Sequence, residues 1–202
     1  MKKLITILIL LTLVGCNRDK NIIDTAEFEN IKVEILSSRD KFGDEIKIKT
    51  DSQEFIIDVE GMNPWKVDFC NVDGKDVELA IGVYKESPHH KEKALRLFLY
   101  NIDFENERLK PKLRISRLYN PLVDFVMMDI DKDGLDEIVS IEENINKKYL
   151  LSGYNWTNFA FERTYSSQVL EEKPIYSNKE GIIKLKDNEY ELFLEGEEIK
   201  WK

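Results

Sequence analysis

Hydrophobic and polar residues alternate along most of the chain in short runs with a period of two. This pattern is typical of half-buried β-strands, whose successive side chains point to opposite faces of a sheet. The clearest runs are residues 31–36, 45–49, 94–100, 149–154, 182–186 and 190–194. Turn-forming pairs such as Gly43-Asp44 separate them, and the best helical candidate, Ser87 to Lys93, is short. We therefore expect an all-β fold of many short strands, either a sandwich, a barrel or a propeller.

The first sixteen residues follow a different pattern. Lys2 and Lys3 precede an apolar run that ends in Leu13-Val14-Gly15-Cys16. This run is shorter than the roughly 20 residues that span a bilayer as a helix, and it has the proportions of a secretory signal. Here the sequence resembles the bacterial lipoprotein signal, in which a small residue precedes an invariant Cys. The resemblance implies cleavage before Cys16 and a diacylglyceryl thioether on its sulfur. The alternatives are an ordinary signal peptide with an incidental Cys, or a tail anchor.

The lipoprotein signal divides the chain into three parts. Residues 1–15 are expected to be the signal peptide, residues 16–27 the lipidated Cys16 and a polar tether, and residues 28–202 the folded domain. The expected location is the bacterial cell envelope, outside the cytoplasm. Because Asn17 rather than Asp follows Cys16, the resemblance implies the outer membrane of a Gram-negative host or the outer face of a Gram-positive cell membrane. Cys70, the only other cysteine, lies in an alternating run and is expected to be a buried hydrophobe.

An internal repeat narrows the choice of fold. Residues 65–84 and 122–141 each contain an apolar strand, an Asp/Asn-Gly loop, an acidic residue and a second apolar strand. A strand carrying Tyr-Asn follows each, at Tyr100-Asn101 and at Tyr154-Asn155. The repeats, near 65–118 and 122–163, have the size of a propeller blade, which needs neighbours to cover its apolar faces.

The loop sequence DIDKDGLDEIV at residues 129–139, with a weaker copy at 71–79, resembles the FG-GAP or VCBS repeats of integrin-α-type β-propellers. The resemblance implies a small or incomplete β-propeller-like array of antiparallel sheets with about four blade-like units. The strands of residues 31–60 and 180–201 would form the remaining units, and pairing them would close the ring.

The Asp-rich loop is a candidate cation site. Hard cations such as Ca²⁺ prefer oxygen ligands, and clustered carboxylates without a cation repel one another. An EF-hand would need Glu at the twelfth position, where Ser140 stands. The resemblance implies instead a strand-loop-strand calcium site. Its ligands would be Asp129, Asp131, Asp133, the carbonyl of Leu135 and Glu137. The alternative is a solvated acidic turn whose side chains cap backbone N–H groups.

The first loop departs from this pattern. It has Asn71 at the first position, Asp73 and Glu78 as its acidic residues, and Lys75 where the third carboxylate belongs. A lysine at that position could supply the positive charge that calcium supplies in the other loop.

Composition and the remaining motifs limit the function. With a formal charge of −9 and a pI near 5.0, the protein lacks the basic excess that a nucleic-acid backbone would require. A basic group stands out within this acidic chain, and it could hold an anionic ligand or lipid head groups or pair with nearby acidic residues. Its members are Arg96, Lys110, Lys112, Arg114 and Arg117. His89 and His90 lie in a polar insertion, expected to be an exposed loop.

No catalytic motif stands out, and whether the protein is an enzyme stays open. We expect a membrane-anchored, non-enzymatic binding module, stabilised by calcium, that presents loops to an envelope protein or a glycan. One alternative is an exported carbohydrate-active hydrolase with paired carboxylates on a propeller. Another is an accessory subunit of an envelope complex. The aromatic residues are expected to pack in the core rather than to form a sugar platform; they are Trp65, Tyr119, Tyr154 and Trp156.

Overall fold

The computed structural model describes residues 20–39, 41–88 and 90–202. The expected signal peptide and Cys16 lie outside the described residues, as does His89. The described chain contains sixteen β-strands, and none of its segments is a helix that could cross a membrane. The all-β fold predicted from the period-two pattern is thereby confirmed.

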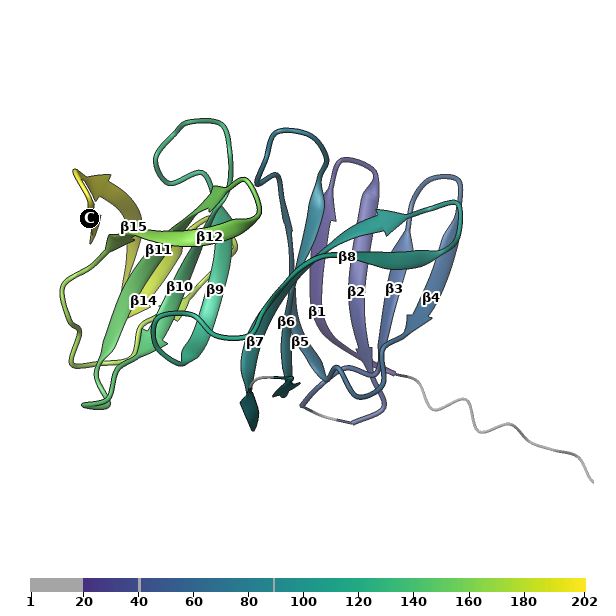
Figure 1. The fold of residues 1–202 in the computed structure, drawn as a ribbon, viewed down its shortest axis with the longest axis horizontal. Helices are drawn as coiled ribbons and strands as arrows, with labels where there is room; N and C mark the ends of the chain where they lie inside the picture. The colour runs from purple at the N-terminus through teal and green to yellow at the C-terminus, as the bar shows by residue number, and fades with distance from the viewer. Residues whose placement is uncertain (1–19, 40, 89) are drawn as a thin grey trace, which may run out of the picture.

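The strands follow one another in four groups of four, which we call units 1 to 4 in chain order (Figure 1). Unit 1 comprises β1 (Asn21–Phe28), β2 (Ile31–Ser37), β3 (Glu45–Lys49) and β4 (Glu54–Asp58). Unit 2 comprises β5 (Pro64–Cys70), β6 (Glu78–Ser87), β7 (His90–Asp103) and β8 (Arg108–Ile115). Unit 3 comprises β9 (Leu122–Met128), β10 (Glu137–Glu143), β11 (Tyr149–Thr157) and β12 (Ala160–Ser166). Unit 4 comprises β13 (Ile175–Tyr176), β14 (Ile182–Leu185), β15 (Asn188–Glu195) and β16 (Glu198–Trp201).

Each unit is an antiparallel meander, in which every strand pairs with the one before it. Units 1 and 2 are separate four-stranded sheets, whereas units 3 and 4 form one eight-stranded sheet. A single parallel pair, Ser166 with Glu198, joins β12 to β16. The outermost strands of this sheet, β13 and β9, also contact each other, and the Tyr176 hydroxyl donates to the Val139 carbonyl at 2.9 Å. The eight-stranded sheet therefore curls into a nearly closed, barrel-like shape.

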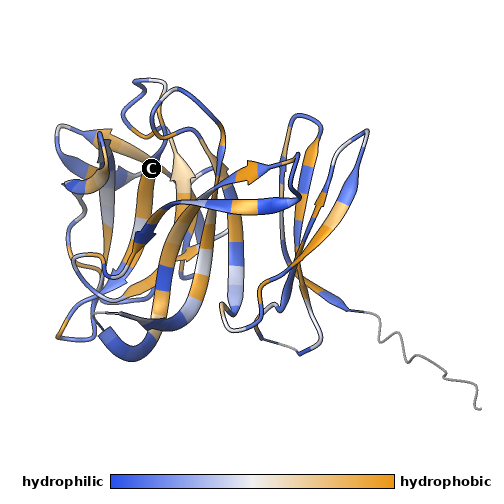
Figure 2. Cartoon of the chain, turned by 45° about the vertical axis from the view of Figure 1, so that its right-hand side comes forward, coloured by the Kyte–Doolittle hydropathy of each residue, from blue (hydrophilic) through white to orange (hydrophobic). Residues whose placement is uncertain are grey.

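Hydrophobic side chains on facing sheets form three successive cores. Figure 2 shows hydrophobic and hydrophilic residues alternating along the strands, so that each sheet can bury one face against its neighbour. Between units 1 and 2, Val33 and Ile46 pack with Ile81. Between units 2 and 3, Leu99 packs with Phe125. Residues of units 3 and 4 fill the interior of the curled sheet and include Val139, Leu151, Ile183 and Ile199.

The first strands of the units lie next to one another. β1 contacts β5, β5 contacts β9, and β9 contacts β13. Lys179, between β13 and β14, then reaches back to unit 1, with its ammonium 3.1 Å from a carboxylate oxygen of Asp24. The same ammonium donates to the carbonyls of Thr25 and Val67. Unit 4 therefore contacts both units 1 and 2.

Two expectations about local structure were wrong. Residues 21–27, expected to be part of a tether, lie in β1, because Ala26 is buried and the strand pairs along most of its length with β2. The segment from Ser87 to Lys93, the best helical candidate, contains the turn between β6 and β7. There the Ser87 hydroxyl accepts a hydrogen bond from the His90 N–H at 3.1 Å. In both places pairing with a neighbouring strand outweighs the local composition.

The connections between strands gather at two ends of the stack. Figure 1 shows the β5–β6 and β9–β10 connections, which contain the two Asp loops, at the same end of the stack, in the upper part of the view. Lys20 and the connections β2–β3 and β4–β5 lie at the other end.

Candidate metal centre

The connection between β9 and β10 is held in shape by its own aspartates. The Asp129 carboxylate accepts hydrogen bonds from the backbone N–H groups of Asp133 and Gly134, both at 3.0 Å. Lys132 and Gly134 have φ values of 65° and 92°, so the backbone turns sharply twice. Gly134 suits the second turn because it has no Cβ to clash in this conformation. The loop folds back so that its alternate side chains can converge.

Three carboxylates meet at this loop. One oxygen from each of Asp129, Asp131 and Glu137 lies within 4.8 Å of the other two. Glu137 is the first residue of β10 and is only 2% exposed. Asp133 is not part of the group, and its carboxylate accepts a hydrogen bond from the Leu135 N–H at 2.8 Å. The structure thus gathers three of the four acidic side chains predicted as ligands, and this triad could hold a metal ion.

The groups around the triad are neutral donors. The Asn155 amide donates to Asp131 at 3.1 Å and to Glu137 at 3.2 Å. The Tyr165 hydroxyl donates to Asp131 at 2.7 Å. Among the described residues, no lysine, arginine or histidine nitrogen lies within 4 Å of these three carboxylates. Burial, together with the neighbouring Asp131, raises the pKa of Glu137 to about 8. The site therefore favours a proton or a cation.

The first Asp loop has the same architecture with a different charge. Glu78 is the first residue of β6, as Glu137 is the first residue of β10. The Glu78 carboxylate accepts a hydrogen bond from the N–H of the buried Val72, and the Glu137 carboxylate accepts one from the N–H of the buried Ile130. In the first loop a lysine of β8 is present. The Lys112 ammonium lies 2.9 Å from Asp73 and also contacts Glu78, which is fully buried.

The lysine expected to supply the charge was wrongly identified. Lys75 lies 3.6 Å from Asp73, but its side chain is 78% exposed and forms no ion pair with Glu78. Burial opposes the charge on Lys112, yet its hydrogen bonds to Glu78 and Asp73 outweigh burial and raise its pKa. No local signal in the sequence marks Lys112, because Glu78 lies 34 positions earlier in the chain and is brought close to it only by strand pairing.

The two Asp loops contact each other directly. The Asn71 N–H donates to the Asp136 carboxylate at 2.7 Å, and the Asp136 N–H donates to the Asn71 carbonyl at 2.9 Å. The Asn71 side chain caps Gly74 N–H at 2.8 Å. Asn71 therefore joins unit 2 to unit 3 and shapes its own loop.

The basic group predicted from the sequence does not form one patch. The Arg96 guanidinium donates to backbone carbonyls, including those of Lys85 and Glu92. Lys110 pairs with Asp103 at 3.0 Å, and Lys112 pairs as described above. Arg114 and Arg117 have no described carboxylate within 4 Å. The two lysines thus pair with nearby acidic residues, whereas Arg114 and Arg117 do not.

Of the residues predicted to lie in the core, all but Tyr119 are buried or partly buried. Cys70 is 2% exposed, and burial raises the pKa of its thiol well above the usual value, so it is a core residue. Tyr154 is buried, and Trp65 and Trp156 are partly buried beside the core between units 2 and 3. Tyr119 instead is 67% exposed.

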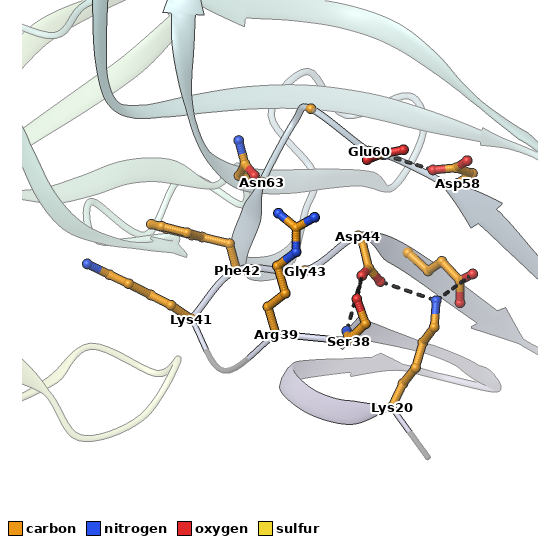
Figure 3. Close-up of a pocket in the computed structure, with 12 residues that line it drawn as sticks. Lys20, Ser38, Arg39, Lys41, Phe42, Gly43, Asp44, Asp58, Glu60 and Asn63 are labelled. Atoms are coloured by element: carbon orange, nitrogen blue, oxygen red, sulfur yellow. Dashed lines mark hydrogen bonds and ion pairs between the residues drawn. The ribbon is translucent and has the colours of Figure 1, made fainter. Parts of the chain in front are cut away.

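A cavity of about 440 Å³ lies beside Lys20, and several carboxylates line it (Figure 3). Asp44 accepts hydrogen bonds from Ser38 and Lys20, while Asp58 accepts one from the Glu60 N–H at 2.8 Å. A glycosidase needs one carboxyl group with a raised pKa as its general acid. Burial raises the pKa of Asp44, but the hydrogen bonds from Ser38 and Lys20 outweigh it and the pKa lies below its usual value. This cavity does not provide that general acid through Asp44.

The chain was compared with known proteins. No protein-family model matches it, and the curated proteins include no match. The interpretation of the site therefore rests on its geometry.

Proposed function

We propose that the protein is a lipid-anchored, extracytoplasmic binding module whose fold is stabilised by calcium in the Asp129–Glu137 loop. The observation that carries the proposal is the triad of Asp129, Asp131 and Glu137, which converges without a cationic side chain among the described residues. A bound divalent cation would neutralise it.

Calcium suits the triad better than a softer metal. Every side chain in the group offers oxygen, and neither cysteine nor histidine belongs to it. Asp133 and the Leu135 carbonyl would complete the oxygen ligands that the repeat family implies. The first loop supports the same interpretation, because its acidic pair is matched by the Lys112 ammonium.

The arrangement of units supports a small propeller-like array. There are four successive four-stranded meanders, their first strands are neighbours, and Lys179 links unit 4 to unit 1. The equivalent hydrogen bonds of Glu78 and Glu137 support the internal repeat. We propose a four-unit version of the FG-GAP type of propeller.

The lipid anchor would orient this array. Cys16 precedes the first described residue, Lys20, by four positions, so its lipid would hold that end near the membrane. The Asp loops lie at the opposite end and would face away from it (Figure 1). The partner would be an envelope protein or a glycan, reached from the outer membrane in a Gram-negative host or from the cell surface in a Gram-positive one.

Calcium binding can be tested by thermal unfolding of the full chain in detergent, with calcium and with a chelator. At 100 times its dissociation constant, a ligand adds about 2.7 kcal/mol of stability. We expect calcium to raise the melting temperature of the wild type and not of Asp131→Ala. Asp73→Ala is the matched control, and it should keep the calcium response. Identical wild-type curves with and without calcium would contradict the metal site.

Lipidation needs a separate test, because it does not depend on calcium. Expression in a bacterium with labelled palmitate should give a labelled, membrane-associated chain, and Cys16→Ser should remove both properties. Cys70→Ser is the control and should remain labelled. A wild-type chain that is cleaved and unlabelled would contradict the anchor.

A further inference from the structure

A groove of about 310 Å³ lies between units 2 and 3, outside the Asp loops. Strand β8, the connection that follows it and strand β12 line this groove. Most of its lining is apolar and includes Leu113, Ile115, Leu118 and Phe161. The volume is at the lower end of the range for small-molecule sites.

Two arginines line the same groove, and neither has a described carboxylate within 4 Å. They are Arg117 and Arg163. The centre of the Arg163 guanidinium lies 4.5 Å from the ring centroid of Tyr119, which holds it by a cation–π contact. Its Nε atom is buried and has no hydrogen-bond partner among the described residues. A buried donor of this kind is normally paired.

Three of the four basic residues of strand β8 pair with carboxylates, whereas Arg114 does not. Arg108 and Lys110 pair with Asp103, each at 3.0 Å, and Lys112 pairs with Asp73. In a chain with 39 acidic residues and 30 basic ones, acidic partners are abundant. The groove thus combines apolar walls with two positive charges that the described carboxylates do not neutralise.

We propose that this groove binds a small apolar molecule that carries a carboxylate. A carboxylate matches the forked guanidinium donors of arginine, while the apolar body would cover Leu113, Leu118 and Phe161. A neutral ligand would leave the arginines unpaired, and a cationic one would be repelled.

The groove fits a small molecule better than an added peptide strand. The exposed edge of unit 2 is β8, where Pro111 lacks an N–H and Arg108 and Lys110 present charges. Both features oppose pairing with another strand. The inference rests on the proposed function in taking the protein as a binding module, but neither calcium nor the lipid contributes to the groove.

The test is equilibrium dialysis of the full chain in a non-ionic detergent against naphthalene-2-carboxylate. Naphthalene-2-carboxamide is the neutral isostere, and detergent without protein gives the background. We expect at least tenfold tighter binding of the carboxylate, with a loss of at least fivefold in Arg163→Gln and in Arg117→Gln. Lys147→Gln, at an exposed lysine that does not line the groove, should bind as the wild type does.

Three results would overturn the proposal. They are equal affinity for the two probes, arginine variants that both bind as tightly as the wild type, and a wild type that does not bind the carboxylate at millimolar concentration. Arg163→Lys keeps the charge without the fork, so intermediate affinity is expected, and the thermal unfolding of each variant verifies its fold. Repeating the dialysis with a chelator tests whether binding of the carboxylate depends on calcium. If the wild type binds the carboxylate but its melting temperature does not respond to calcium, the metal site is rejected and the groove proposal stands.

Discussion

The ammonium group of Lys112 lies 2.9 Å from the carboxylate of Asp73, where it also contacts the buried Glu78. These two acids correspond to Asp131 and Glu137 in the next unit, where the neutral Asn155 amide and Tyr165 hydroxyl donate hydrogen bonds in place of an ammonium group. The same loop architecture therefore occurs twice in one chain, once with a built-in cation and once without. The comparison allows the charge balance of the two loops to be tested in a single protein.

Removing the built-in cation should destabilise unit 2. In Lys112→Met the carboxylates of Glu78 and Asp73 lose their ion pair, and breaking such a buried pair costs about 3–5 kcal/mol. We expect a loss of about 3 kcal/mol by denaturant unfolding with a chelator, partly restored by calcium. Lys75→Met is the matched control, because that side chain is 78% exposed, and its change should be below about 1 kcal/mol. Equal effects of the two substitutions would argue against a structural role for Lys112.

Replacing Glu137 by its neutral isostere should separate stability from metal binding. Because the pKa of Glu137 is raised to about 8, chiefly by burial, its ionised form costs stability in the cation-free protein. Glu137→Gln should therefore gain about 3 kcal/mol near pH 7 with a chelator, because pH 7 lies about 2.5 units above the usual pKa of 4.5 and each unit corresponds to about 1.4 kcal/mol. The same variant should lose the stabilisation by calcium. Isothermal unfolding with and without calcium measures both, and a variant that still responds to calcium would exclude Glu137 as a ligand.

Asp68 should make stability depend on pH. It is 7% exposed, its carboxylate accepts the Met127 N–H of β9 at 3.1 Å, and burial raises its pKa to about 6. Between pH 4 and 6 the folded state keeps a proton that the unfolded state releases. This group therefore contributes full stability below about pH 4, and the contribution falls as the pH rises through 6.

Asp68→Asn should remove this part of the pH dependence. At pH 7 the variant should be more stable than the wild type by about 2 kcal/mol, and near pH 4 the two should be similar. Urea unfolding from pH 4 to pH 8 provides the comparison. An unchanged slope in the variant would assign the pH dependence to other carboxyl groups.

Lys179 should hold the ends of the array together. Its ammonium contacts Asp24 and Thr25 of β1 and Val67 of β5, 112 to 155 residues earlier in the chain. In Lys179→Met we expect a loss of about 1–3 kcal/mol, because the Asp24 carboxylate and the carbonyls of Thr25 and Val67 lose their donor. Hydrogen exchange should become faster in β1 and in the β13–β14 connection. Lys186→Met, at a side chain 71% exposed, is the control, and equal exchange in the two variants would contradict the link.

The period-two pattern was sufficient to predict the strands because it depends on neighbouring residues alone. The predicted runs at 45–49, 149–154 and 190–194 all lie in strands. Predictions failed where composition and pairing disagree. Residues 21–27 are polar overall, but they pair with β2, and the segment after Ser87 turns between two paired strands.

The Asp-rich loop could also be recognised from the sequence. Asp129 and Asp131 lie close in the chain, and Gly134 marks the turn that lets them converge with Glu137. The role of Lys112 could not be predicted in this way, because that residue is 34 positions from Glu78 and approaches it only through the pairing of β7 with β8.

By itself, then, the sequence determined the all-β class and the acidic loop from which the triad is drawn, because strand periodicity and loop spacing are local properties of the chain. Only the tertiary structure decided which groups surround the acidic loops and the arginines. Lys112 neutralises one loop and Lys179 joins distant units, whereas Arg117 and Arg163 meet at an apolar groove without a described carboxylate. These relationships depend on strand register and on the packing of whole sheets, since both bring together residues far apart in the chain.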